Sequence, residues 1–267
     1  LKERVLRMEL KSQILDKVKK AQISKIMHSH IYEAESASRC KNEFLFFVKP
    51  EITLANSEIQ IQDILDLVFK QIEKYELKIQ SARVLSAEYL KEYDIIANHY
   101  GVINKIASNA SENISDSAQV EFEEQFGTKF SESETLGGFE FLKTYECFNT
   151  DSLDYLWQNS KNIKLAGGTY CEKIKLDDKI VYLVNGFHPR QLVHFTNPGR
   201  SIIVFNLIGD LNWAEARNDF IGSTNPVNAK ENSLRRLFLD NMNSLGLTEV
   251  SQGMNGVHLS AGPVEGL

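Results

Sequence analysis

The first 43 residues carry apolar side chains at steps of three and four positions, and lysine or arginine fills many of the gaps between them. The stripe contains Val5, Leu6, Leu10, Ile14, Leu15, Val18, Ile23, Ile26 and Met27. Because neither glycine nor proline interrupts it, the pattern predicts an amphipathic helical arm over 1–43. Its apolar stripe must be buried, either against its own domain or against another chain. His28 and His30 would point to different faces of such a helix, which favours a solvated helix end over a metal pair.

A different pattern follows, in which apolar runs alternate with helical spacing. The run from Phe44 to Val48 is continuous and aromatic, which is typical of a buried central strand, and Pro50 ends it. Helical spacing over 61–75 precedes a weakly alternating strand over 77–85. Ser86 is the expected N-cap of a further helix that ends at Gly101. Residues 201–208 form the strongest strand pattern of the second half.

Residues 101–185 differ from the segments on either side and are predicted to be an insertion. Residues 107–117 are rich in serine and asparagine, which favours a flexible entry. Alternating residues over 171–176 and 180–184 flank Asp177-Asp178-Lys179 and predict a β-hairpin. Several aromatic residues give this region apolar content of its own, so it is expected to form an ordered subdomain.

Composition narrows the classes of partner. The net charge of −6 and the pI of about 5.6 argue against sequence-specific nucleic-acid binding, which needs a basic surface. No run reaches the roughly 18 apolar residues of a membrane span. The three cysteines are far apart in the sequence, which predicts free thiols in a reducing compartment. Together with the lack of a visible secretory signal, this predicts a cytoplasmic protein.

Candidate chemistry is concentrated in 222–263. Thr224 precedes Asn225-Pro226, where turn geometry lets a hydroxyl and backbone amides face an anion. Arg235 follows in Ser-Leu-Arg-Arg, and a planar guanidinium suits phosphate oxygens. His258 lies further on as a candidate nucleophile, with Asn255 and Ser260 on either side. Taken separately, an arginine pair is more often part of a solvated helix face, and a lysine such as Lys49 more often simply ends a strand.

Taken together, the motifs resemble those of the nucleoside diphosphate kinase family. They are Val48-Lys49-Pro50-Glu51, Asn98-His99-Tyr100, Gly222-Ser-Thr-Asn-Pro-Val-Asn-Ala, Ser233-Leu-Arg and Asn255-Gly-Val-His258-Leu-Ser260, in the family's order. The resemblance covers 44–100 and 186–267, which we expect to form the family's core. It implies an α+β fold, a ferredoxin-like split βαβ sandwich with an antiparallel four-stranded sheet.

The resemblance also implies an activity, the transfer of the γ-phosphate of a nucleoside triphosphate to a nucleoside diphosphate through a phosphohistidine. His258 would be the nucleophile, and Lys49, Tyr100, Thr224 and Arg235 would bind phosphate. Asn255 would bond to the ribose 3′-hydroxyl. Mg²⁺ would bridge the phosphates with few protein ligands, so no protein metal site is expected. The family commonly forms homo-oligomers.

Four departures from the family pattern concern the histidine and the base. Leu259-Ser260-Ala261 stands where the family has Gly-Ser-Asp. The glutamate that orients the imidazole has no counterpart at Glu265, and we expect it beyond 267. Asn218 replaces a family arginine, with Arg217 next to it as a candidate substitute. His188-Pro189-Arg190 stands near the family's Arg-Pro-Phe loop, so Phe187 or Arg190 could stack on the base.

These observations leave three functions open. The first is an active phosphotransferase with an added arm and insertion. The second is a nucleotide-binding regulatory or interaction module with weak or no kinase activity, which the changes at Asn218, Leu259 and Ala261 favour. The third is an assembly protein without enzymatic function. Base preference depends on the segment that departs most from the family.

Overall fold

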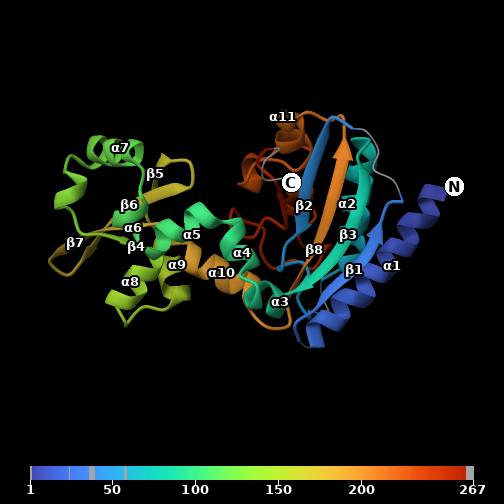
Figure 1. Cartoon of the computed structure of the whole chain (residues 1–267), viewed down its shortest axis with the longest axis horizontal. Coiled ribbons are helices and arrows are strands. Elements are labelled where there is room, and N and C mark those ends of the chain that lie inside the picture. The colour runs from blue at the N-terminus through green and yellow to red at the C-terminus, as the bar shows by residue number, and fades with distance from the viewer. Residues whose placement is uncertain (1, 24, 36–39, 57–58, 263–267) are drawn as a thin grey trace. The chain divides into compact units, whose positions relative to one another are not determined.

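The structure is a computed structural model of the chain, and it describes residues 2–23, 25–35, 40–56 and 59–262. Two compact units make up the chain (Figure 1). The first comprises Leu1–Tyr93 and Phe195–Leu267, and the second comprises Asp94–His194. Each unit has its own β-sheet and its own hydrophobic clusters, as expected of a domain.

The first unit contains a five-stranded sheet in which every neighbouring pair is antiparallel. Its order is β1-β3-β8-β2-β9. The strands are β1 (His28–Glu33), β2 (Asn42–Val48), β3 (Lys78–Ser86), β8 (Ser201–Gly209) and β9 (Val257–Leu259). Helix α2 (Ile61–Lys74) connects β2 to β3, and α12 (Leu234–Asp240) lies between β8 and β9 in the chain. This mixed α+β arrangement is consistent with a ferredoxin-like fold, although the sheet has five strands where four were predicted.

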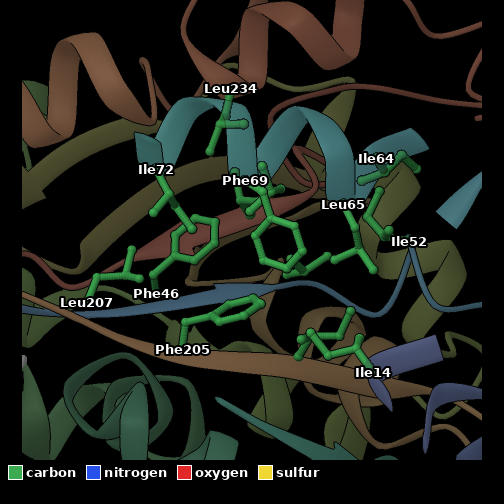
Figure 2. Close-up of a cluster of buried hydrophobic side chains, with 14 of the residues drawn as sticks. Ile14, Phe46, Ile52, Ile64, Leu65, Phe69, Ile72, Phe205, Leu207 and Leu234 are labelled. Carbon is green, nitrogen blue, oxygen red and sulfur yellow. The ribbon is translucent and has the colours of Figure 1, made fainter. Parts of the chain in front are cut away.

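The central strands form where the sequence is most apolar. In β2 and β8 the register places Phe46 opposite Phe205. Figure 2 shows these two rings beneath Phe69 and Ile72 of α2. Because alternate strand residues point to opposite faces, Phe44, Phe46 and Val48 all enter this core.

Helix α1 (Lys2–Ile23) buries the middle of the predicted apolar stripe against its own unit, whereas Val5, Leu6 and Ile23 are exposed. Leu10, Ile14, Val18 and Ala21 are buried in the same cluster as the residues of α2. At its edge, the Lys11 ammonium lies 2.7 Å from the Asp66 carboxylate of α2.

The prediction of a helix end at His28 and His30 was wrong, because both residues lie in β1. Strand β1 pairs with β3 at the edge of the sheet, with His28 opposite Leu85. Its side chains are only partly buried or exposed, so its sequence lacks the apolar run that identifies a central strand.

The second unit has a four-stranded sheet of order β4-β7-β6-β5. The strands are β4 (Thr135–Gly137), β5 (Ile163–Ala166), β6 (Thr169–Leu176) and β7 (Lys179–Val184). The predicted hairpin is confirmed as β6 and β7, with Asp177 at its turn in a left-handed conformation. Successive β7 residues enter different clusters: Tyr182 packs with Phe122, and Leu183 with Phe141 and Trp157.

Helices occupy the stretch for which a flexible entry was predicted, so that prediction was wrong. Asn109 and Ser115 cap two of these helices by accepting hydrogen bonds from backbone N–H groups. Gly101 follows α4 and its C-cap Tyr100, as predicted for the end of a helix, and it also begins the next helix. The helices of this unit are α4 (Ile95–His99), α5 (Gly101–Ser108), α6 (Ala110–Asn113), α7 (Asp116–Phe126), η1 (Phe130–Glu132), α8 (Gly138–Thr144) and α9 (Thr150–Gln158).

Five helical segments remain among the described residues. They are α10 (His188–Thr196), α11 (Trp213–Glu215), η2 (Ala216–Phe220), η3 (Pro226–Asn228) and α3 (Ala87–Glu92). Ser86 caps α3 as predicted, because its side chain accepts from the Tyr89 N–H. Within the described ranges, no helix has both the length and the hydropathy needed to cross a membrane.

Candidate functional site

His258 lies in the middle of the short strand β9. It is opposite Phe47 of β2, and the two rings are stacked with centroids 4.5 Å apart and an interplanar angle of 15°. The neighbours Val257 and Leu259 are buried in the core of the first unit. Because side chains alternate along a strand, His258 lies on the opposite face of the sheet, half-buried. The Phe47 ring therefore defines the plane of the imidazole.

Arg235 connects the glycine turn at Gly222 to β9. It lies in the first turn of α12, and only 8% of it is exposed. Its Nη1 donates to the Gly222 main-chain oxygen over 2.9 Å, and its Nη2 donates to the Val257 oxygen over 3.0 Å. A planar guanidinium can make both bonds at once, so one cation is fixed beside the strand that carries His258.

Lys49 leaves β2 next to the same segment. Its backbone N–H donates to the Gly256 oxygen over 2.8 Å, and its ammonium lies 3.5 Å from the Gly253 oxygen. The residue is 6% exposed. Burial lowers the pKa of Lys49 to about 8, and Arg235 adds to the lowering, while Glu51 opposes it. A buried cation with few strong acceptors is well suited to an incoming anion.

Asn255 is fully buried and only partly satisfied. Its Nδ2 donates to the main-chain oxygens of Thr224 and Gln252 over 3.0 and 3.1 Å. Its Oδ1 has no hydrogen-bond partner within the described residues. An unpaired buried acceptor costs roughly 1–3 kcal/mol, so a donor from outside the chain would be stabilising here.

The backbone at Gly256 orders this segment. Gly256 has φ of +80°, and a Cβ at this position would lie 2.5 Å from the Phe238 ring. Its N–H donates to Oε1 of Glu51 over 2.8 Å. Sequence reasoning gave no role to Glu51, although it lies in the Val48-Lys49-Pro50-Glu51 motif, because the contact links residues 205 positions apart.

The other candidate residues of the first unit make different hydrogen bonds; they are Thr224, Ser260 and Arg217. Thr224 is exposed in its loop and contributes its main-chain oxygen to Asn255. The buried Ser260 hydroxyl accepts from the Leu45 N–H over 3.1 Å and so continues the hydrogen bonding of β2 beyond β9. Arg217, in η2, donates to the Ala261 oxygen over 3.2 Å and thereby reaches the segment after His258.

The other three candidate residues belong to the second unit. The Tyr100 ring lies between α4 and α5, 6.5 Å from the His188 ring. Phe187 packs against Trp157 with ring centroids 5.7 Å apart. Arg190 pairs with Asp151 over 2.6 Å. Phe187 and Arg190 are thus engaged inside this unit, and Glu265 lies outside the described residues.

The site has the donor set of an anion site. Lys49 and Arg235 supply positive charge, and Asn255 and the loop backbone supply polar groups. In the part of the chain that the structure describes, no three His, Cys, Asp or Glu side chains are grouped to hold a metal ion. Two surface hollows of about 530 and 430 Å³ lie elsewhere, one beside the β6–β7 turn and one beside Gly209.

Comparisons with known proteins give structural neighbours only. No protein-family model matches the chain, and no curated protein matches it significantly. An apo nucleoside diphosphate kinase from Encephalitozoon cuniculi is 11% identical with a TM-score of 0.37, over 84% of this chain and 83% of the other. An NDP kinase from Pyrobaculum aerophilum is 16% identical with the same TM-score, over 84% and 91%. Scores this low establish neither the fold nor the activity of this chain.

Proposed function

We propose that the first unit is a ferredoxin-like phosphotransferase that moves the γ-phosphate of a nucleoside triphosphate to a nucleoside diphosphate through His258. The observation that carries the proposal is that Arg235 and Lys49 donate to the backbone of 253–257, the segment that contains the buried Asn255 and comes immediately before the histidine. The ordered set of motifs that resembles the family supports it independently.

The reaction follows from the chemistry of these groups. An imidazole nitrogen of neutral His258 attacks the γ-phosphorus, and the bond from that phosphorus to the β,γ-bridging oxygen breaks. The electron pair leaves with the nucleoside diphosphate. In the second half, a terminal phosphate oxygen of the acceptor attacks the phosphorus and the P–N bond breaks, which restores His258. Lys49 and Arg235 neutralise the negative charge that the phosphates bring.

Mg²⁺ enters this proposal with the nucleotide. The grouped cations and amide fit phosphate oxygens better than a metal ion, so the chain's own residues would hold the phosphates. Mg²⁺ bound to those phosphates would supply further charge neutralisation. A homo-oligomer, which the resemblance implies, stays a prediction that light scattering tests.

A second candidate function is a nucleotide-binding module that transfers no phosphate. The donors of Arg235 and Asn255 are directed at main-chain oxygens, which stabilises the segment whether or not catalysis occurs. Leu259 and Ala261 also replace the family's residues after the histidine. Such a module would bind nucleotides and use them to regulate an interaction.

Nucleotide-dependent stabilisation and phosphate exchange separate the two functions. A phosphotransferase is stabilised by ADP and exchanges phosphate between ATP and a second diphosphate, and His258→Ala abolishes only the exchange. His30→Gln, an exposed histidine of β1, is the matched control and should retain exchange. Stabilisation without exchange in the unaltered chain would favour the module. The absence of both would contradict both functions.

A further inference from the structure

Glu51 is a nearly buried carboxylate at the exit of β2, and only 8% of it is exposed. Its Oε1 accepts a hydrogen bond from the Gly256 N–H over 2.8 Å. The Gly256 oxygen in turn accepts from the Lys49 N–H over 2.8 Å. Gly256 is therefore held from both sides by the Lys49-Pro50-Glu51 segment.

This contact reaches two residues of the proposed site through the backbone. Gly256 follows Asn255 and precedes β9, on which His258 is the second residue. The positive φ at Gly256 turns the chain in a way that other residues rarely adopt. The hydrogen bond that the Gly256 N–H donates to Glu51 holds this turn, and the turn sets the direction in which the chain enters β9.

Glu51 also sets the balance of charge around Lys49. Lys49 and Arg235 are both nearly buried, and two cations disfavour each other's charge in a region with little water. Burial and Arg235 lower the pKa of Lys49, whereas the Glu51 carboxylate raises it. His258 is the titratable group on the neighbouring strand.

We propose that Glu51 is the positioning residue of this anion site: its hydrogen bond from the Gly256 N–H orients Asn255 and His258, and its carboxylate places a negative charge near Lys49. The inference rests on the proposed function for its ligand, but its effect on Lys49 is a property of the chain alone.

Glu51→Gln tests the charge with little change in shape, because the amide oxygen can still accept from the Gly256 N–H. The protein is labelled with ¹³C at the lysine Cε, and Lys49→Arg assigns the Lys49 signal. In Glu51→Gln the titration midpoint of Lys49 should fall by at least about half a pH unit. The pH above which ADP affinity declines should fall with it. Glu92→Gln, an exposed glutamate of α3, is the control for loss of one charge.

The two readouts separate this inference from the proposed function. An unchanged Lys49 midpoint in Glu51→Gln would overturn the effect of Glu51 on Lys49, even if ADP binds normally. An ADP affinity in Glu51→Ala equal to that of Glu51→Gln would overturn the positioning role, because only the alanine removes the acceptor of the Gly256 N–H. If the unaltered chain binds no ADP, the proposed function fails, and the Lys49 titration still decides the role of Glu51. A merely structural residue would lower thermal stability without moving the midpoint.

Discussion

Arg235 donates a hydrogen bond from Nη2 to the main-chain oxygen of Val257, the residue immediately before His258, over 3.0 Å. The same guanidinium donates to the Gly222 oxygen. The turn at Gly222, the start of α12 and strand β9 are therefore connected by one buried side chain. Both the stability of the strand and the placement of the Arg235 guanidinium depend on this connection.

Arg235→Lys should destabilise the first unit by about 1–3 kcal/mol, because an ammonium cannot replace the two-pronged contact and leaves a buried carbonyl without its donor. Urea denaturation measures the change. Arg236→Lys is the matched control on the same helix, since its partly exposed pair with Asp240 should contribute less than about 0.5 kcal/mol. Equal effects of the two substitutions would contradict the structural role of Arg235.

Gly256→Ala should cost roughly 1–3 kcal/mol or more, since an alanine at this positive φ is strained and its Cβ would meet the Phe238 ring. Gly253→Ala, three residues earlier, has open space around the added methyl group and should change stability by less than about 0.5 kcal/mol. Thermal denaturation of the two variants makes the comparison. If Gly256→Ala leaves the stability unchanged, the turn before β9 is wrongly described.

Asn255 should make the chain sensitive to the ribose of its ligand. If its unpaired Oδ1 accepts from a 3′-hydroxyl, 3′-deoxy-ADP should bind about 3- to 10-fold more weakly than ADP. In Asn255→Ala the two nucleotides should bind equally, whereas Asn243→Ala, at an exposed position, should keep the difference. Calorimetric titration measures all the affinities. Equal binding of both nucleotides to the unaltered chain would remove this role.

Glu172 of β6 should make the stability of the second unit depend on pH. It is fully buried, and neither carboxylate oxygen has a hydrogen-bond partner within the described residues. The nearby Ser160 hydroxyl instead donates to the Leu156 oxygen. Burial raises the pKa of Glu172 from an ordinary value of 4.5 to about 7, and Ser160 opposes this only in part.

The direction of this pH dependence follows from whether the folded or the unfolded chain binds the Glu172 proton more tightly. The folded chain does, so stability should fall as pH rises from about 4.5 to about 7 and stay reduced above that, by about 1–3 kcal/mol. Glu172→Gln should flatten this window, and Glu146→Gln, at an exposed position, should leave it unchanged. Denaturant titrations at pH 5 and pH 8 measure the difference. A dependence that survives in Glu172→Gln would show that another group causes it.

The central strands and the hairpin were predictable because their signals are local. Continuous apolar residues predicted β2 and β8, and alternation around Asp177-Asp178 predicted β6 and β7. Strand β1 was missed because an edge strand needs few apolar residues, and its pairing with β3 is absent from the local pattern. The helices of 101–126 were missed because serine and asparagine are uncommon inside helices, whereas Asn109 and Ser115 lie at helix N-termini, where their side chains accept from backbone N–H groups.

The residues of the candidate site were predicted as a set of motifs, whereas their hydrogen bonds were not predictable from the sequence. Ser260 was expected to be a site hydroxyl, but it serves the β2 edge. Glu51 gained its role from a contact with Gly256 that only the folded chain creates. Sequence motifs thus identify the residue types that phosphate chemistry needs, and tertiary contacts show which of them hold the segment around His258 in place.

The most direct measurement for the central claim is detection of a phosphoenzyme at His258. The chain is incubated with ATP and Mg²⁺, digested without acid, and analysed by mass spectrometry for the peptide that contains 253–262. The account predicts one added phosphoryl group on His258, which acid removes, which excess nucleoside diphosphate discharges, and which His30→Gln retains. An unmodified His258 in a chain that demonstrably binds ATP would contradict phosphoryl transfer through this residue.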